Sequence, residues 1–478
     1  MPNHNVQETV ILCSVCGVQN QRIAKFCVNC RSPLSLDQRM TAREAEKIQS
    51  ELSRLRSRSR KFRRFLITLS LTGLLLAFGF FIYRENSGLE DPSSNIGAVS
   101  EQGSWPMYQG GPLLNGLSVD PQAPEPGTSD KKTLWVFNTK DGISGAPSVA
   151  DGILYFSTKG NQILALETNS GEVIWEFPTE AASDSVLAIA GELVFSALKE
   201  GRLVALDRYD GSLVWDFKTS EPFFSSPNIF NGVLYVGSSD KNVYALDAAN
   251  GEMRWRYKVG SRVTTTLAAN DEIVAFIAQD NMVRIIDSMT GDFRLDYPTD
   301  ASGGTVSLDG KRLFFGDLNG TLRAIDWTKV QLPLEKAARR FRLQMFLWGF
   351  EKRPPVLKGT VWRFRNPQES FQGTPSVGKG AVYIPTSAGN VYKVSASNGK
   401  PVWKYESGSR LTQPVTVTEG TAYVGDISGK IHGISTETGE LVWEFFVEGE
   451  VTSPVVFAEG TLFVTTNNYG QGKLYAIR

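Results

Sequence analysis

The sequence contains few of the residues that most often carry redox or metal chemistry. Only four of its 478 residues are cysteine, only two are histidine, and the formal net charge is zero. A net charge of zero argues against nucleic-acid binding by the whole protein. All four cysteines lie within the first 30 residues, so everything that follows must fold without disulfide bonds.

Over most of the chain the sequence repeats with a period of 40 residues and shows no helical periodicity. Trp175, Trp215 and Trp255 keep this step, and so do Gly171 and Gly211. Each unit contains four short runs of β-branched and aromatic residues, separated by Asn-Gly or Asp-type turns. Such runs indicate antiparallel strands, and four strands in roughly 40 residues is the pattern of a propeller blade.

The number and phase of the repeats predict the architecture. The third strand of the unit recurs eight times. The fourth-strand tryptophan position also recurs eight times, with one departure to leucine, at Trp135, Trp175, Trp215, Trp255, Leu295, Trp362, Trp403 and Trp443. We therefore expect an all-β, eight-bladed propeller over residues 133–478. The chain meets a fourth strand first and ends on a third, so its first strand should complete the last blade and close the ring. The tryptophans should wedge between neighbouring blades.

The repeat resembles that of the pyrroloquinoline-quinone (PQQ) type of propeller. The residues that carry the resemblance are Gly-x-x-x-Trp at 171–175, 211–215, 251–255, 399–403 and 439–443, and the lead-in Trp105-Pro-Met-Tyr-Gln-Gly. Within that family the resemblance implies a non-catalytic propeller of the BamB type, which binds proteins. BamB-type proteins are lipoproteins, whereas no lipobox cysteine precedes this propeller.

An enzymatic alternative follows from the same resemblance. Quinoprotein dehydrogenases of the family carry an adjacent cysteine pair beside PQQ, and a calcium site. This propeller has no cysteine, and its only histidine is His432, for which a contact within the blades is expected. We therefore do not expect PQQ to be a cofactor or the chain to be an enzyme.

The four cysteines form two C-x2-C pairs, at Cys13 and Cys16 and at Cys27 and Cys30. Two such pairs supply the four thiolates of a closed, structural zinc site, and redox disulfides are the alternative. The segment resembles the short zinc ribbon at the N-terminus of many bacterial membrane proteins, although Arg31 stands where that family usually has glycine. We expect a zinc ribbon over residues 1–38.

One segment, residues 65–83, is 19 residues long and carries no charge. That length suits a transmembrane helix, and the basic residues that precede it place the N-terminus in the cytoplasm and the propeller outside. Reduced cysteines before the span and none after it agree with this topology. We expect a single-pass protein of the inner cell membrane, with a basic juxtamembrane helix at 41–64 that begins at the capping box Thr41 to Glu44. Residues 84–132 are expected to be a linker and lead-in segment.

The repeat breaks once, where residues 328–359 are inserted between a third and a fourth strand. A helix is expected at 334–350. Its basic and aromatic residues suit a membrane surface or a groove on a partner, and folding back over the ring is the alternative. The predicted partner-binding residues are Arg339, Arg340, Arg342, Phe346, Trp348 and Phe350.

Three functions are compatible with this organisation. The first is a membrane-anchored extracytoplasmic scaffold that binds proteins or peptides, as BamB-like proteins do in envelope protein assembly. The second is a PQQ-dependent dehydrogenase. The third is a sensor that couples an extracytoplasmic ligand to the cytoplasmic ribbon. The expected cofactor is one structural zinc ion, and the expected partners are the membrane and a protein or peptide, without nucleic acid.

Overall fold

The computed structural model describes most of the chain, in several segments. These are residues 9–16, 18–35, 39–51, 70, 72–73, 103–118, 120, 132–300, 304–332, 334–371, 373–411 and 413–478. The chain divides into two compact units, Met1–Gly88 and Leu89–Arg478.

The smaller unit contains a three-stranded antiparallel sheet in the order β2-β1-β3. Its strands are β1 (Thr9–Leu12), β2 (Gln19–Gln21) and β3 (Arg39–Thr41), so the sheet extends past the expected ribbon boundary at residue 38. A helical segment follows from residue 42 to 51. Its predicted capping box is present, because Glu44 N donates to Thr41 Oγ1 (3.4 Å) and Thr41 N donates to the Glu44 carboxylate (3.1 Å).

The expected membrane segment at 65–83 falls outside the described residues except at positions 70, 72 and 73. Within the part of the chain that the structure describes, no helix combines the length and the apolar character needed to cross a membrane.

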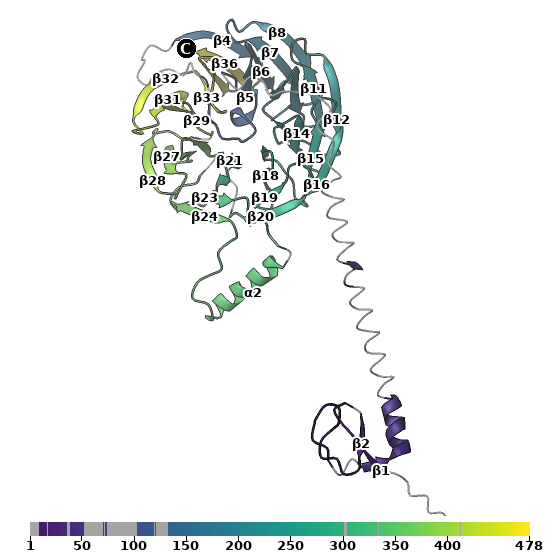
Figure 1. Ribbon diagram of the computed structural model, residues 1–478. Helices are drawn as coiled ribbons and strands as arrows, with labels where there is room; N and C mark the ends of the chain where they lie inside the picture. Colours follow the sequence, from purple (N-terminus) through teal and green to yellow (C-terminus); the bar gives the residue numbers. More distant parts are fainter. Residues whose placement is uncertain are drawn as a thin grey trace, which may run out of the picture. The chain divides into compact units, whose positions relative to one another are not determined.

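The larger unit is a β-propeller (Figure 1). Its described strands form seven four-stranded sheets and one five-stranded sheet. The first four sheets in chain order comprise β5 (Ile143–Ala150), β6 (Ile153–Thr158), β7 (Gln162–Glu167), β8 (Val173–Pro178); β9 (Ala188–Ala190), β10 (Leu193–Ala197), β11 (Arg202–Asp207), β12 (Leu213–Lys218); β13 (Asn228–Phe230), β14 (Val233–Gly237), β15 (Asn242–Asp247), β16 (Met253–Lys258); and β17 (Ala268–Ala269), β18 (Ile273–Ala278), β19 (Met282–Asp287), β20 (Phe293–Pro298).

The other sheets follow the same order. They comprise β21 (Ser307–Asp309), β22 (Arg312–Gly316), β23 (Thr321–Asp326), β24 (Thr360–Arg365); β25 (Ser376–Gly378), β26 (Ala381–Pro385), β27 (Asn390–Ser395), β28 (Pro401–Glu406); β29 (Thr416–Val417), β30 (Thr421–Gly425), β31 (Lys430–Ser435), β32 (Leu441–Phe446); and the five-stranded sheet of β33 (Glu450–Val451), β34 (Val456–Ala458), β35 (Thr461–Asn468), β36 (Gln471–Ile477) and β4 (Thr133–Thr139). The helix α2 (Glu335–Leu347) lies between β23 and β24.

Burial differs between the inner and outer strands of each sheet. The second strand is mostly apolar and almost entirely buried, as in β14 and β26, because it is covered by the neighbouring sheets on both faces. The fourth strand alternates between exposed and buried residues and lies at the rim of the ring, where β8, β12, β16, β24, β28 and β32 are seen (Figure 1).

Closure of the ring follows the predicted scheme. Strand β4 comes from the start of the propeller and pairs antiparallel with β36 from its end, with Trp135 opposite Ala476. The closing sheet is therefore built from both ends of the chain segment, which removes an open sheet edge.

Six of the repeated tryptophans join one sheet to the next, as predicted. The Trp175 indole Nε1 donates to the carbonyl oxygen of Arg208, 33 residues later, at 2.9 Å. Its ring lies against Gly211, where a Cβ would come within 2.7 Å of the indole, and φ at this glycine is +75°. The same pairing of donor and glycine recurs for Trp135 with Gly171, Trp215 with Gly251, Trp255 with Gly291, Trp362 with Gly399 and Trp403 with Gly439. Only a residue without a side chain admits the indole so closely.

Residues 103–118 and 120, which we call the strap, were expected to belong to a linker and lead-in segment. They instead hydrogen-bond to the innermost strand of each sheet. Trp105 exchanges two backbone hydrogen bonds with Val149 of β5, at 2.8 and 2.9 Å. The other strap contacts are Pro106 O with Ile189 of β9, Pro112 O with Asn228 of β13 and Ala269 of β17, Leu113 O with Leu308 of β21, Asn115 O with Val377 of β25, Gly116 O with Val417 of β29, and Ser118 Oγ with Phe457 of β34. The strap therefore satisfies backbone groups at the inner sheet edges.

The tryptophan–glycine contact can be tested with a matched pair of glycines. Gly211 and Gly152 both have positive φ, +75° and +78°, but nothing lies within 4 Å of a Cβ at Gly152. Both Gly211→Ala and Gly152→Ala carry the strain of a left-handed alanine. Only Gly211→Ala must also displace the Trp175 indole, so we expect it to lose about 1–3 kcal/mol more stability. Urea unfolding of the two variants measures the difference, and equal midpoints would contradict the docking role of the tryptophan.

Candidate functional site

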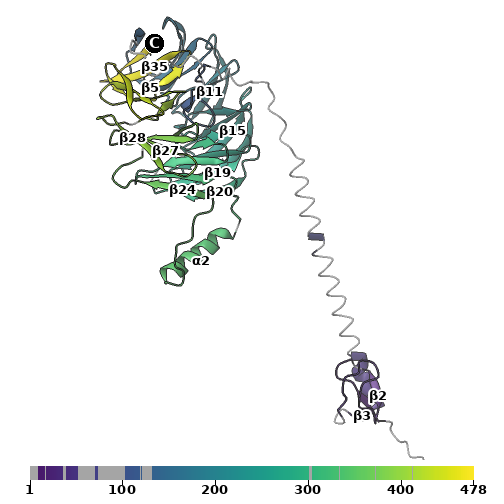
Figure 2. The same ribbon diagram turned by 60° about the vertical axis from the view of Figure 1, so that its left-hand side comes forward.

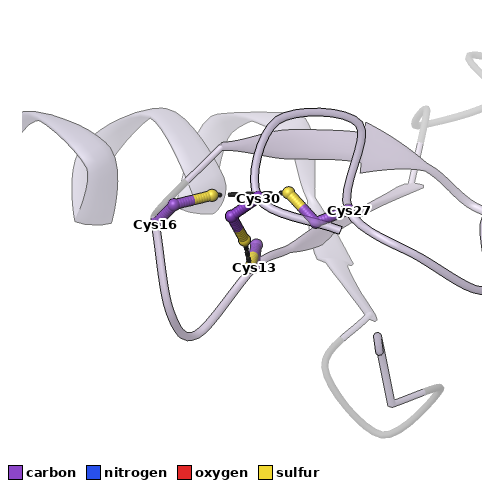
Figure 3. Close-up of side chains that lie close together, drawn as sticks. All are labelled: Cys13, Cys16, Cys27 and Cys30. Carbon is purple, nitrogen blue, oxygen red and sulfur yellow. Dashed lines mark hydrogen bonds between the residues drawn. The ribbon is translucent and has the colours of Figure 1, made fainter. Parts of the chain in front are cut away.

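The four cysteines meet at one point of the small unit (Figure 3). Cys13 and Cys16 lie in the turn after β1, and Cys27 and Cys30 lie in a second turn after β2. The Sγ atoms of Cys13 and Cys30 are 3.5 Å apart, those of Cys16 and Cys27 are 3.3 Å apart, and all four lie within 4.8 Å of one another. No disulfide joins these four cysteines.

The surroundings favour the thiolate at two of the sulfur atoms, Cys27 and Cys30, whereas at Cys16, despite a backbone hydrogen bond at Val18, burial and hydrogen bonds with the other cysteines raise the pKa to about 11. The backbone N–H groups of Cys30 and Asn29 point at Cys27 and hold the pKa of its thiol at about 6. Hydrogen bonds from Ser32 lower the pKa of Cys30. Because a metal binds the deprotonated sulfur, these donors favour a bound metal ion.

Two further residues shape the cluster. Buried Asn20 places its Nδ2 3.7 Å from Cys27 Sγ, and its Oδ1 accepts from the backbone N of Val28 at 2.8 Å. Arg31 adopts φ +57°, a left-handed conformation that favours glycine, and its N donates to Cys27 O at 3.0 Å. Asn20 was not identified from the sequence, because a lone asparagine between two cysteine pairs has no spacing signal.

The cluster fits a tetrahedral metal ion with four sulfur ligands. Zinc–sulfur bonds of about 2.3 Å place the sulfurs of such a site about 3.8 Å apart. The sulfur atoms here lie within 4.8 Å of one another, and two of the pairs are 3.5 and 3.3 Å apart, so they are gathered near that spacing. Four protein ligands leave no open position for a substrate, so the chemistry that the cluster supports is structural.

The insertion in the propeller forms an arm, residues 328–359, that contains α2. Its base is fixed to β20 of the preceding sheet. The backbone N of Gln331 donates to Arg294 O at 2.8 Å, and the Lys336 ammonium pairs with Asp296 while lying 5.1 Å from the ring centre of Phe293. Lys358 returns to Glu335 at 2.6 Å, so the two ends of the arm are also joined.

The body of the arm is uncovered. No described side chain of α2 is buried, and α2 stands clear of the sheets in both views (Figures 1 and 2). Of the predicted partner-binding residues, Arg340, Arg342, Trp348 and Phe350 are exposed, and Arg339 and Phe346 are half-buried. Arg342 binds Glu351 at 2.9 and 3.1 Å, which lowers the pKa of Glu351 and ties the helix to the returning chain. The arm therefore does not fold back over the ring.

Leu295 and the arm, the two irregularities of the repeat, meet at one interface. The leucine lies 3.6 Å from the position of a Cβ on Gly359, and it shares a buried cluster with Trp327. The Trp327 Nε1 donates to Gly310 O at 2.9 Å. Trp327 of the fifth sheet thus takes the place of the tryptophan that the fourth sheet lacks at position 295. The arm begins at the next residue.

His432 has the blade contact that was expected. Its Nδ1 lies 3.0 Å from the Tyr405 hydroxyl and its Nε2 lies 3.2 Å from the carboxylate of Asp426. His432 lies on β31 and Asp426 follows β30 of the same sheet, whereas Tyr405 lies on β28 of the preceding sheet; His432 and Asp426 are almost fully buried. The histidine therefore joins two neighbouring sheets in the core of the ring.

A family model described as "Outer membrane protein assembly factor BamB" matches residues 119–198, 169–331, 358–426 and 387–477. These ranges cover well over half of the chain. The chain belongs to this family. The matched ranges leave out residues 332–357, so most of the arm is not part of the shared repeat. A comparison with curated proteins found no match.

Solved structures share the fold at low sequence identity. BamB from Moraxella catarrhalis is 16% identical with a TM-score of 0.55, and the match covers 73% of this chain and 98% of that one. The quinohemoprotein alcohol dehydrogenase from Comamonas testosteroni is 14% identical with a TM-score of 0.60, covering 78% and 80%. A europium-containing methanol dehydrogenase is 14% identical with a TM-score of 0.63, covering 78% and 98%.

The residues of this ring do not match the PQQ site expected from the quinoprotein dehydrogenases. No cysteine follows Cys30, so the adjacent pair cannot be supplied by the propeller. In addition, the strap takes up hydrogen-bonding groups along the inner edge of each sheet. The residues of the ring therefore give no support for PQQ as a cofactor.

The metal fit can be checked by metal analysis of the full chain. We expect one zinc ion per chain, lost in Cys27→Ser, because three remaining thiolates cannot close the site. Ser32→Ala removes only a hydrogen bond to Cys30 and should keep the ion. Affinity should fall as the pH drops, since protons compete for the thiolates. A purified chain that is folded around reduced cysteines without metal would contradict the assignment.

Proposed function

We propose that this protein is a membrane-anchored extracytoplasmic scaffold that binds proteins or peptides in envelope assembly. The eight sheets are its complete set of blades, residues 65–83 are its single span, and the cysteine cluster is a structural zinc ribbon in the cytoplasm. Family membership supports the scaffold role, and the charge and cysteine distribution of the sequence supports the topology.

One observation carries the binding role: every fourth strand exposes apolar side chains at the outer edge of the ring. Each fourth strand presents at least one exposed large apolar side chain, namely Leu134, Val136, Val173, Ile174, Leu213, Val214, Met253, Phe293, Val361, Val402, Leu441 and Phe446. We call this set the rim belt. The inner sheet edges are bonded to the strap, whereas the fourth strands are the outer edges of their sheets. Strand addition at such an edge combines backbone hydrogen bonds with apolar contacts to the added peptide.

Photo-crosslinking in cells tests the rim belt. A photoreactive residue at Ile174 or Val214 should give discrete protein adducts, because a partner strand would lie directly against it. Glu192 and Asp271 are exposed residues in turns between inner strands and serve as matched controls without adducts. Rim positions that give no adduct, or the same adducts as the controls, would rule out the rim as the binding surface.

The enzymatic alternative has a direct test. The purified full chain, supplied with PQQ and calcium, should reduce no dye with alcohols or sugars, because the ring lacks the cysteine pair of the dehydrogenases. A quinoprotein dehydrogenase assayed in parallel controls for active cofactor. Robust turnover by this chain would overturn the scaffold proposal.

A further inference from the structure

The arm carries a charge that sets it apart from the rest of the protein. Between residues 328 and 359 there are eight lysine or arginine side chains and two glutamates, a net charge of +6. The whole chain is neutral, so the remainder carries the opposite excess. A surface with this much positive charge is complementary to an anionic partner.

One face of α2 and its flanks is apolar and largely exposed. Leu334, Phe341, Met345 and Trp348 follow each other at helical spacing and therefore share a face. The exposed fractions are 80% for Leu334, 64% for Phe341 and 62% for Trp348. Moving apolar side chains of this size out of water lowers the free energy, so an exposed row of them indicates a missing partner surface.

The distribution of the remaining side chains favours a lipid surface over a protein groove. A helix that fills a groove needs one apolar stripe and a polar back. Here Leu343 and Leu347 lie among the arginines on the other side, and both are exposed. A helix in the headgroup region tolerates this pattern, because arginine stems can lie along the acyl boundary while their guanidinium groups bind phosphate. Tryptophan is also enriched at that depth.

The base of the arm gives the helix a defined place on the ring. The hydrogen bond from Gln331 to Arg294 and the ion pairs of Lys336 and Lys358 hold both ends of the loop. The apolar and basic side chains farther along α2 are left uncovered. Such an arm can present its helix to a planar surface without unfolding any sheet.

We propose that α2 and the residues up to Phe350 lie in the headgroup region of an anionic phospholipid bilayer. Arg339 and Arg340 bind lipid phosphates, and Phe341, Trp348 and Phe350 enter the acyl boundary. The inference rests on the membrane location in the proposed function and adds a second point of attachment, made by the propeller itself.

Hydrogen–deuterium exchange of the full chain in vesicles tests this proposal. An isolated helix of this length is marginally stable in water, so its amides should exchange quickly when it is free. We expect protection of residues 335–347 in vesicles of phosphatidylcholine mixed with phosphatidylglycerol, and little in phosphatidylcholine alone. In the double variant R339Q/R340Q the ratio of protected to open arm should fall about 25-fold, because removing each cation lowers this ratio about five-fold.

Two controls make the result specific. K218Q/K258Q removes the same charge from exposed positions on β12 and β16 and should leave the protection intact. R339K/R340K keeps the charge and should restore it. Equal protection in both kinds of vesicle, or none in either, would overturn the proposal. Protection that appears only on addition of a partner protein would assign the arm to a protein groove instead. The rim crosslinks do not depend on these arginines, so failure of the arm is distinguishable from failure of the scaffold function.

Discussion

The propeller depends on one contact, the docking of a tryptophan indole onto the turn of the next sheet. The turn supplies a glycine with positive φ, which clears space for the ring, and a carbonyl oxygen, which accepts the indole N–H. The contact thus buries the large apolar surface of the indole and also pairs its N–H group. Where the contact is missing, the ring compensates locally. At Leu295 an indole arrives from the opposite side as Trp327. At Trp443 the next turn would join β36 to β4, which come from opposite ends of the propeller, and the ring keeps only its packing on Tyr423 of its own sheet, a contact that Trp175 also makes with Tyr155.

The same contact explains why so much of the fold could be predicted. Because tryptophan and glycine meet in six of the eight repeats, their spacing is fixed in the sequence, and it predicts both the strands and the pairing of β4 with β36. The cysteine cluster was equally accessible, since ligand spacing follows from metal geometry. The strap was not. It makes a different contact with each sheet, so nothing in it repeats, and Trp105 alone indicated its importance. Asn20 was missed for the same reason, since its role depends on Val28 and Cys27 lying nearby in space.

The irregular parts of the ring concentrate in one place. The leucine at 295, the buried Trp327 and the departure of the arm all belong to the interface between the fourth and fifth sheets. A loop that is held at its base by the preceding sheet can lengthen without disturbing the repeat, because no strand pairing changes: β24 still pairs with β23 as in the other sheets. The insertion thus adds a basic, apolar surface to a scaffold whose own core is unaffected.

The strap has a mechanical consequence. It precedes β4 in the chain, so tension applied from the N-terminal side reaches its hydrogen bonds before it reaches the strand that closes the ring. Those bonds are distributed over the first strands of all the sheets and must be broken at many places around the ring. If β4 were attached directly to a tether, the same tension would peel one strand from one edge, bond by bond. The strap therefore protects the pairing of β4 with β36, which closes the ring, against tension applied through the preceding chain.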